Sequence, residues 1–158
     1  MKNNIFILKK IDTEIIDQLV SIYDSAFNKF NFRNWSFKDF NDLINTGAHI
    51  FYCIYDNIIV GFTIVRFDQD SSEIITIAIE SSYQKKQIGK SLLNYIINRP
   101  EFKGHLILEV AVSNINAINF YKNFGFKKIG QRKNYYLVLK GNKVGKKIDA
   151  IVMQLQKS

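Results

Sequence analysis

One polar segment joins a strand to a helix, and the chain can be read outward from it: Tyr83-Gln84-Lys85-Lys86-Gln87-Ile88-Gly89-Lys90-Ser91-Leu92-Leu93. The residues before it, 74–79, form an apolar run of strand length. After it, apolar residues recur at helical spacing: Ile88, Leu92, Leu93, Ile96 and Ile97. We therefore expect a strand, a polar turn and a helix whose N-terminus faces the turn.

The start of such a helix suits an anion. Its first backbone N–H groups lack partners within the helix, and the helix dipole is positive there. Lys85, Lys86 and Lys90 add positive charge around it. A phosphate or pyrophosphate would fit, although the segment matches neither G-x-x-x-x-G-K-[ST] nor G-x-G-x-x-G. The alternative interpretation is an ordinary turn with a solvated basic face.

The composition indicates one globular domain over residues 1–158. Of these residues, 47% are hydrophobic, so the chain can bury a sizeable core. No apolar run is long enough to span a bilayer, and the first residues do not resemble a secretory signal. Cys53 is the single cysteine, and its apolar surroundings predict an inert core residue. A cytoplasmic location fits these features.

The net charge of +8 is unevenly distributed. Residues 1–100 hold 11 basic and 11 acidic residues, whereas residues 101–158 hold 11 basic and 3 acidic ones. This excess favours an anionic cofactor, or contact of the C-terminal third with a ribosome or RNA. The alternative is a compositional bias, because lysine, asparagine and isoleucine are frequent throughout.

The N-terminal half predicts strands in a meander with two helices. Four segments have strand-like patterns: residues 5–8, 50–55, 58–67 and 73–79. Asp56-Asn57 is expected to form a hairpin turn between two of them. Thr13 can cap the first helix, and Ser36 with Asp39 forms a capping-box pattern for the second.

The C-terminal half alternates helices with strands. Ser113, Asn114 or Asn116 can cap a helix that ends at Gly125. A basic, glycine-bearing segment follows at residues 132–148. Three segments are strand-like: residues 105–111, 126–131 and 150–155. Together with the meander, this order predicts a single α/β domain with a mixed sheet.

Several motifs along this order resemble those of the GCN5-related N-acetyltransferase (GNAT) superfamily. Residues 84–89, Gln-Lys-Lys-Gln-Ile-Gly, are similar to its acetyl-CoA signature, Arg/Gln-x-x-Gly-x-Gly/Ala, and residues 108–126 to its second signature. Trp35-Ser36, residues 132–136 and residues 149–153 resemble motifs of RimI-type members, which acetylate the N-terminal alanine of a small-subunit ribosomal protein. The resemblance covers nearly the whole chain. It implies a mostly antiparallel sheet flanked by helices.

The resemblance also implies roles for individual residues. Glu109 matches the general base, Tyr121 the general acid and Asn114 a contact of the co-substrate acetyl-CoA. The loop amides would hold the pyrophosphate, and the preceding strand would pair with the pantetheine arm and direct an N–H at the thioester oxygen. The residues concerned are Ile77, Ala78 and Ile79 in the strand and Lys85, Lys86, Gln87, Ile88, Gly89 and Lys90 in the loop. No metal is expected, because no His, Cys and carboxylate cluster has ligand spacing.

The same residues have plainer interpretations, and two positions depart from the family pattern. Glu109 can be an outward-facing strand residue, Tyr121 a core residue and Asn114 a helix cap. Gln87 stands at the first glycine of the acetyl-CoA signature, where a negative φ would tolerate a side chain and a positive φ would strain it. Leu137 follows Asn-Tyr-Tyr where RimI-type enzymes usually have proline.

The sequence thus favours an acetyl-CoA-dependent N-acetyltransferase. The resemblance implies direct attack by a protein N-terminal amine, with a ribosomal protein as the favoured acceptor. Transfer to a small amine or an internal lysine is one alternative. A non-catalytic module is the other, binding a ribosome or RNA through the basic third and the exposed rings of Tyr135 and Tyr136.

Overall fold

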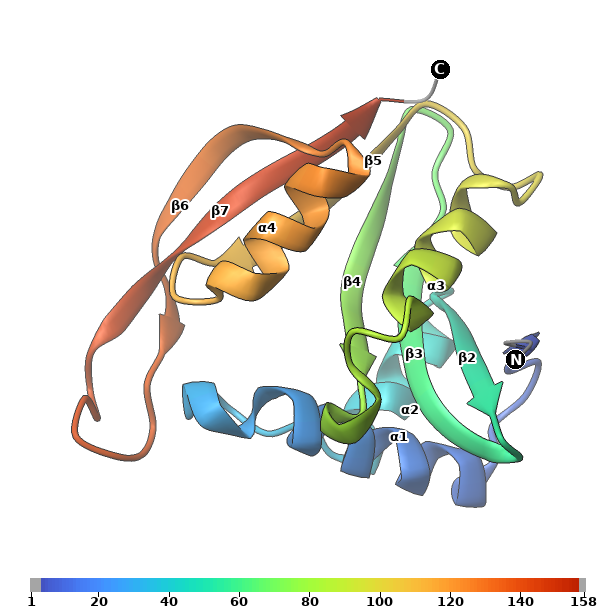
Figure 1. The fold of residues 1–158 in the computed structure, drawn as a ribbon, viewed down its shortest axis with the longest axis horizontal. Coiled ribbons are helices and arrows are strands. Elements are labelled where there is room, and N and C mark those ends of the chain that lie inside the picture. Colours follow the sequence, from blue (N-terminus) through green and yellow to red (C-terminus); the bar gives the residue numbers. More distant parts are fainter. Residues whose placement is uncertain (1–3, 157–158) are drawn as a thin grey trace.

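The computed structural model describes residues 4–156, which form one seven-stranded sheet with helices on both faces (Figure 1). The strand order is β1-β2-β3-β4-β5-β7-β6. Only β4 and β5 run parallel; the other described neighbours pair antiparallel. The strands are β1 (Asn4–Ile7), β2 (His49–Tyr55), β3 (Ile58–Arg66), β4 (Ser71–Ile79), β5 (His105–Ala111), β6 (Lys127–Leu137) and β7 (Lys147–Gln156). The predicted α/β class and the mixed, mostly antiparallel sheet are confirmed.

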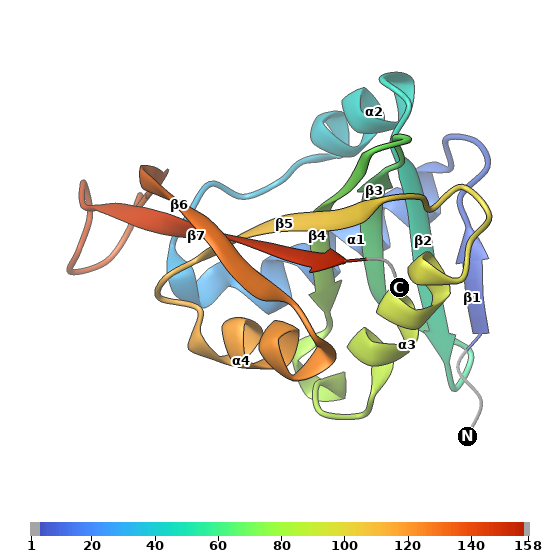
Figure 2. The same cartoon turned by 90° about the horizontal axis from the view of Figure 1, so that it is seen from above.

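The helices divide between the two faces of the sheet (Figure 2). On one face, α1 (Thr13–Phe27) and α2 (Phe37–Asn45) pack on an apolar cluster that includes Ile50, Phe62 and Ala78. On the other face, α3 (Ile88–Ile97) and α4 (Ile115–Phe124) cover Leu106, Leu108 and Val110. Two short 3-10 helices, η1 (Asn28–Phe30) and η2 (Ser81–Tyr83), follow α1 and β4. No helix within residues 4–156 is both long and apolar enough to cross a membrane.

Local signals account for several of these elements. Asp56 and Asn57 have φ of 52° and 66°, the left-handed pair that a tight hairpin turn requires, so the predicted turn is confirmed. The N-terminal cap of α1 is Asp12, whose carboxylate accepts from the Ile15 N–H at 3.1 Å; the prediction of Thr13 was wrong by one residue. Both are good caps, but Asp12 has the extended backbone that the position needs.

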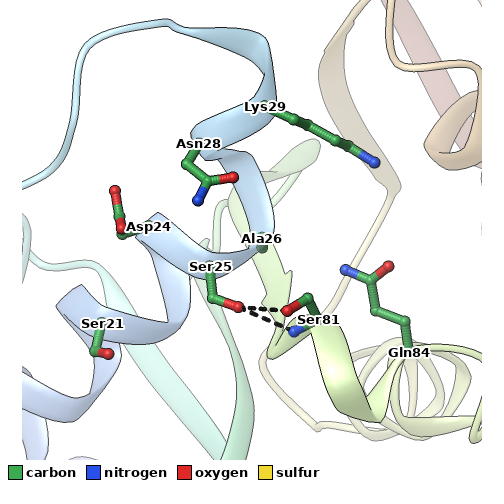
Figure 3. A pocket seen from close by; sticks show the side chains of 8 residues that line it. All are labelled: Ser21, Asp24, Ser25, Ala26, Asn28, Lys29, Ser81 and Gln84. Carbon is green, nitrogen blue, oxygen red and sulfur yellow. Dashed lines mark hydrogen bonds between the residues drawn. The ribbon is translucent and has the colours of Figure 1, made fainter.

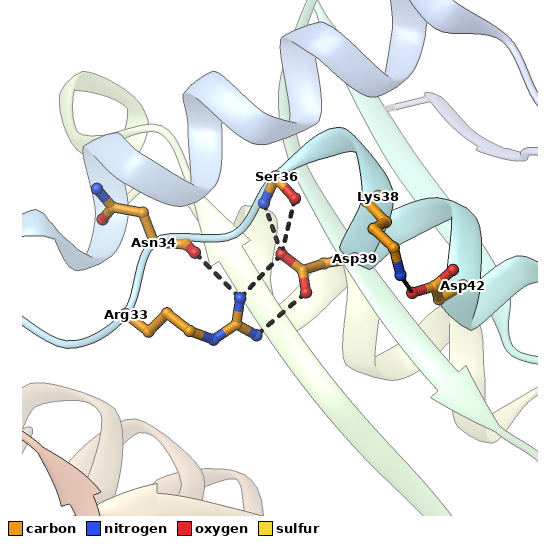
Figure 4. A network of polar contacts seen from close by, with 6 residues as sticks. All are labelled: Arg33, Asn34, Ser36, Lys38, Asp39 and Asp42. Carbon is orange, nitrogen blue, oxygen red and sulfur yellow. Dashed lines mark hydrogen bonds and ion pairs between the residues drawn. The ribbon is translucent and has the colours of Figure 1, made fainter.

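The predicted capping box of α2 is confirmed (Figure 4). The Ser36 N–H donates to Asp39 Oδ2 at 2.7 Å, and Arg33 donates to both oxygens of the same carboxylate at 3.1 Å. Partial burial opposes ionisation of Asp39, but the hydrogen bonds from Arg33 and Ser36 outweigh it and lower its pKa. This network fixes the start of α2 and the end of the connection from α1.

The last two strands are longer than the sequence predicted. β6 was expected at residues 126–131 but extends to Leu137, and β7 starts at Lys147 instead of residue 150. β6 is an edge strand with mostly exposed residues, so it lacks the apolar alternation by which half-buried strands are recognised. The basic segment 132–148 is therefore largely a hairpin that projects from the body of the molecule (Figure 1).

The sheet opens between β4 and β5. Their parallel pairing runs from Ser71–His105 to Ile74–Leu108. Beyond it, residues 76–79 stay paired with β3 and residues 109–111 stay paired with β7, while the structure shows no pairing between these two stretches. Backbone groups of β4 are thus left facing a gap in the middle of the sheet. All the predicted site residues lie on the elements that border this gap or follow from it.

Candidate active site

A tight loop leads from the end of β4 into α3. The Glu80 carboxylate caps η2 by accepting from the Ser82 N–H at 2.8 Å, and the Gln84 amide donates to the Ile79 carbonyl at 3.2 Å. Lys85 then has φ of 64° and Gln87 has φ of 67°, after which the helix begins. The amides of the first turn of α3, at residues 88–90, are the ones an α-helix leaves without internal partners. The predicted order of strand, polar turn and helix N-terminus is confirmed, and we call residues 84–90 the anion loop. Binding of an anion at this loop stays a prediction.

Gln87 therefore has the backbone conformation that strains a residue with a side chain. A left-handed conformation costs a non-glycine residue roughly 1–2 kcal/mol. The loop nevertheless keeps its form, because Gln87 accepts at its carbonyl from both the N–H and the hydroxyl of Ser91 at 3.0 Å. The strain reduces stability and leaves the loop amides in place.

We expect Gln87→Gly to raise the free energy of unfolding by about 1 kcal/mol, because relief of strain exceeds the extra entropy of an unfolded glycine. The measurement is urea denaturation. Lys86→Gly is the matched control, since Lys86 lies in the same loop at negative φ and gains only the entropic cost. Equal destabilisation by both substitutions would contradict the prediction.

Gly89, the second signature glycine, is required by packing. A Cβ at this position would lie 3.1 Å from Cζ of Phe120 on α4, which is closer than ordinary contact. The absence of a side chain lets α3 and α4 approach each other beside the gap. The anion loop and the helix that carries Tyr121 are thus held together by direct packing.

Glu109 lies on β5 at the border of the gap. It alternates with Leu108 and Val110, which point into the α3/α4 core, so its side chain points to the opposite face. Its Oε1 accepts from Arg132 Nη1 at 2.7 Å, and its Oε2 is buried without a hydrogen-bond partner. A carboxylate with one anchored and one free oxygen can accept a proton from a group entering the gap.

Tyr121 lies on the α3/α4 side of the same strand. Its side chain packs with Leu108 and Val110, and its ring centroid is 5.5 Å from that of Phe126. Burial, and to a smaller extent the neighbouring Tyr136 phenol, raise the pKa of Tyr121 well above its usual range. The ring is therefore a core residue, as the plainer interpretation expected, and the phenol keeps its proton at neutral pH.

Tyr136 on β6 connects the two predicted catalytic residues. Burial is the largest cause of the raised pKa of Tyr136, and the charges of Tyr135 and Glu109 are smaller causes. The same phenol acts electrostatically on Tyr121. Tyr136 thus lies near both residues, although Glu109 and Tyr121 are on opposite faces of the sheet.

Asn114 caps α4, and its side-chain oxygen accepts from the Ala117 N–H at 3.2 Å. The structure thus gives this residue a structural role, and its predicted contact with acetyl-CoA stays a prediction.

In strand β4, Ala78 is buried towards α1 while Ile77 and Ile79 pack on the α3 side, as alternation requires. Cys53 is fully buried, and burial raises its pKa to about 11, as expected for an inert thiol.

A stacked aromatic pair, Phe32 and Tyr136, was not predicted from the sequence. Phe32, from the connection between α1 and α2, stacks on Tyr136 with centroids 4.8 Å apart, and the Leu139 N–H donates to the Asn31 carbonyl at 2.7 Å. The β6–β7 hairpin is thereby joined to that connection. The aromatic residues of 28–35 are evident in the sequence, but Tyr136 lies more than 100 residues away, so the contact is seen only in the folded structure.

A surface hollow of about 470 Å³ lies between the end of α1 and the start of the anion loop (Figure 3). The Ser25 hydroxyl accepts from the Ser81 N–H at 3.1 Å and lies 2.8 Å from the Ser81 hydroxyl. The Glu80 carboxylate also accepts a hydrogen bond from Ser25. The hydrogen bonds from Ser82 and Ser25 lower the pKa of Glu80, and the one from the Ser82 side chain contributes most. The end of α1 is thereby fastened to the anion loop.

Comparison with known proteins agrees with this geometry. A family model described as "Acetyltransferase (GNAT) family" matches residues 16–126. The chain belongs to this family. The prediction of a GNAT-type N-acetyltransferase is thereby confirmed at the level of the family.

Individual relatives extend the comparison. The [ribosomal protein bS18]-alanine N-acetyltransferase of Escherichia coli K12 is 33% identical over 125 residues, covering 77% of this chain and 80% of that protein. N-alpha-acetyltransferase 50 of Danio rerio is 32% identical over 106 residues, and the match spans 63% of each chain. The crystal structure of the E. coli S18-alanine enzyme superposes with a TM-score of 0.81 at 27% identity, covering 99% of this chain and 95% of that one.

Proposed function

We propose that this protein is an acetyl-CoA-dependent N-acetyltransferase that acetylates the N-terminal α-amine of a protein, with a ribosomal protein as the favoured acceptor. One observation carries the proposal: the sheet opens between β4 and β5, with the Glu109 carboxylate on β5 at the border of the gap and the anion loop where β4 leads into α3. The E. coli relative, which is named for acetylating the alanine of ribosomal protein bS18, supports the choice of acceptor.

The residues fit acetyl-CoA by their chemistry. The first-turn amides of α3 and the lysines around them suit a pyrophosphate, and the unpaired edge of residues 77–79 suits an amide-bearing arm that adds to the sheet. When bound, acetyl-CoA supplies the thioester carbonyl that the amine attacks. A backbone N–H of β4 can stabilise the oxygen of that carbonyl as it gains negative charge.

Glu109 and Tyr121 then handle two different protons. An α-amine has a pKa of about 8, so roughly a tenth is neutral at pH 7 and a modest base suffices. Oε2 of Glu109 is the free oxygen that can take the amine proton directly or through one water. Tyr121 can give its proton to the departing thiolate. Burial disfavours both charged forms, the thiolate and the phenolate, so the raised pKa of Tyr121 does not prevent the transfer.

Ribosome or RNA contact through the basic third stays a proposal. Lys140, Lys143, Lys146 and Lys147 are exposed on the projecting hairpin, together with Val144. A cluster of this sign suits phosphate backbones. It lies on the same hairpin as Tyr136, so a bound ribosomal partner could present its N-terminus near Glu109.

A panel of acceptors tests the proposal. With acetyl-CoA, we expect an alanine-initiated peptide without lysine to gain one acetyl group by mass spectrometry. A peptide with a blocked N-terminus and one internal lysine is the matched control, and we expect it to stay unmodified. Acetylation of the lysine peptide, or only of a small amine, would favour the first alternative. Failure on all acceptors, with no acetyl-CoA-dependent rise in melting temperature, would favour a non-catalytic module.

A further inference from the structure

We propose that Arg132, delivered by a bulge in β6, is a positioning residue that holds one oxygen of the Glu109 carboxylate and leaves the other oxygen to take the acceptor proton. The inference rests on the proposed function, because it assigns a partner to the base of that reaction. Nothing in the sequence gave Arg132 this role.

The contact between the two side chains is one-sided. Arg132 Nη1 donates to Oε1 of Glu109 at 2.7 Å, while Oε2 is buried without a partner. An arginine beside a carboxylate frequently engages both oxygens. Two other arginine–carboxylate pairs in residues 4–156 do so: Arg33–Asp39 and Arg99–Glu101. The single contact at Glu109 thus leaves Oε2 without an arginine donor.

A bulge in β6 gives Arg132 this geometry. Arg132 pairs with Ala150 and Tyr136 with Ile148, so three residues of β6, 133–135, oppose Asp149 alone. In a regular strand, residues three positions apart point to opposite faces. Here the Arg132 guanidinium lies over the Tyr135 ring, 4.5 Å from its centroid. The bulge has brought both side chains to the face of Glu109.

Asp149 holds the bulge. Its Oδ1 accepts from the Asn134 N–H at 2.9 Å and its Oδ2 from the Gln131 side chain at 2.7 Å, and these bonds lower the pKa of Asp149. Asn134 has φ of 55°, a conformation that asparagine tolerates better than most residues. The bulge is therefore built by its own residues and does not depend on a ligand.

Arg132 supplies the positive charge that contacts Glu109. The Tyr135 phenol of β6 lies within hydrogen-bonding reach of the carboxylate, and Tyr136 is coupled to it by charge. Glu73 of β4 acts electrostatically on Arg132 and Tyr135, and Tyr23 of α1 on Tyr136. None of these carries positive charge. Asp149 of β7 faces Gln131 and Lys133. Without Arg132, the partly buried carboxylate would have no cation in contact, and a buried carboxylate without a counter-charge is harder to ionise.

The test compares kcat and kcat/KM from roughly pH 5 to 9 for the wild type, Arg132→Gln and Arg132→Lys, with an alanine-initiated peptide. We expect Arg132→Gln to lose about 10- to 100-fold in kcat. On the acidic side of the profile, the slope of log(kcat/KM) against pH should change from one to two at a higher pH than in the wild type, because protonation of Glu109 then adds to protonation of the amine. Arg132→Lys should restore part of both. Lys133→Gln is the matched control, since it removes the same charge from the same strand without touching Glu109.

A substrate-free measurement separates this inference from the proposed function. Carbon-13 NMR of the Glu109 carboxyl, assigned with Glu109→Gln, should show its titration moving to higher pH in Arg132→Gln and not in Lys133→Gln. An unchanged titration together with a pH profile parallel to that of the wild type would overturn the inference, even if the peptide is acetylated. If no peptide is acetylated, the NMR titration alone still decides whether Arg132 controls Glu109.

Discussion

Glu109→Gln will lower turnover of an alanine-initiated peptide by roughly 10- to 1000-fold near neutral pH, because glutamine keeps the shape of the side chain but cannot accept a proton. Part of the loss should return at higher pH, where more of the amine is already neutral. Acetyl-CoA affinity should change little, because the loop amides at residues 88–90 are untouched. The measurement is a pH–rate profile together with a direct binding assay for acetyl-CoA.

The position of Glu109 supports a loss of this size. Its Oε2 is shielded from solvent, so no bulk water can replace it as a base without entering the gap. Glu14→Gln is a suitable control, since Glu14 is an exposed carboxylate on the first turn of α1. Wild-type turnover in Glu109→Gln at every pH would show that the free amine alone suffices and that Glu109 is an ordinary strand residue.

The sequence predicted those parts of the site that short-range signals determine. The turn at Asp56-Asn57 and the box formed by Ser36 and Asp39 depend on residues within three positions of each other, and both form as expected. The anion loop likewise follows from a strand, a polar segment and a helix in direct succession. Such features carry their physical cause in one local stretch.

The remaining parts depend on contacts between distant residues. Arg132 and Glu109 are 23 positions apart, and their pairing requires a bulge set by Asp149, a residue of a third strand. The positive φ of Gln87 was undetermined in the sequence, because glutamine itself gives no sign of a left-handed backbone. The length of β6 was also hidden, since an exposed edge strand has no apolar period.

The opposite-face arrangement gives Tyr121 a distinct signature in the same assay. A base on one side of β5 can receive the amine proton while an acid on the other side faces the leaving group, so the two residues control separate steps. Their losses should therefore differ in pH dependence. The melting temperature separates either catalytic loss from a general loss of structure, because only a damaged fold would lower the melting temperature as well.

We expect Tyr121→Phe to lower turnover by about 100-fold, and we expect this loss to persist at every pH. The substitution removes only the hydroxyl, so the ring contacts with Phe120 and Phe126, whose centroids are 5.3 Å and 5.5 Å away, should preserve the fold. Raising the pH cannot compensate, because the supply of neutral amine is not what the variant lacks.

The raised pKa of Tyr121 adds a prediction for the wild type. Because burial holds the phenol protonated beyond its ordinary pKa of about 10, the wild-type rate should show no fall on the alkaline side up to roughly pH 9. Tyr95→Phe is the matched control, since Tyr95 packs against the same core from α3 and its hydroxyl contacts Arg99. If Tyr121→Phe and Tyr95→Phe both keep wild-type turnover, Tyr121 contributes packing alone and the thiolate leaves without its proton.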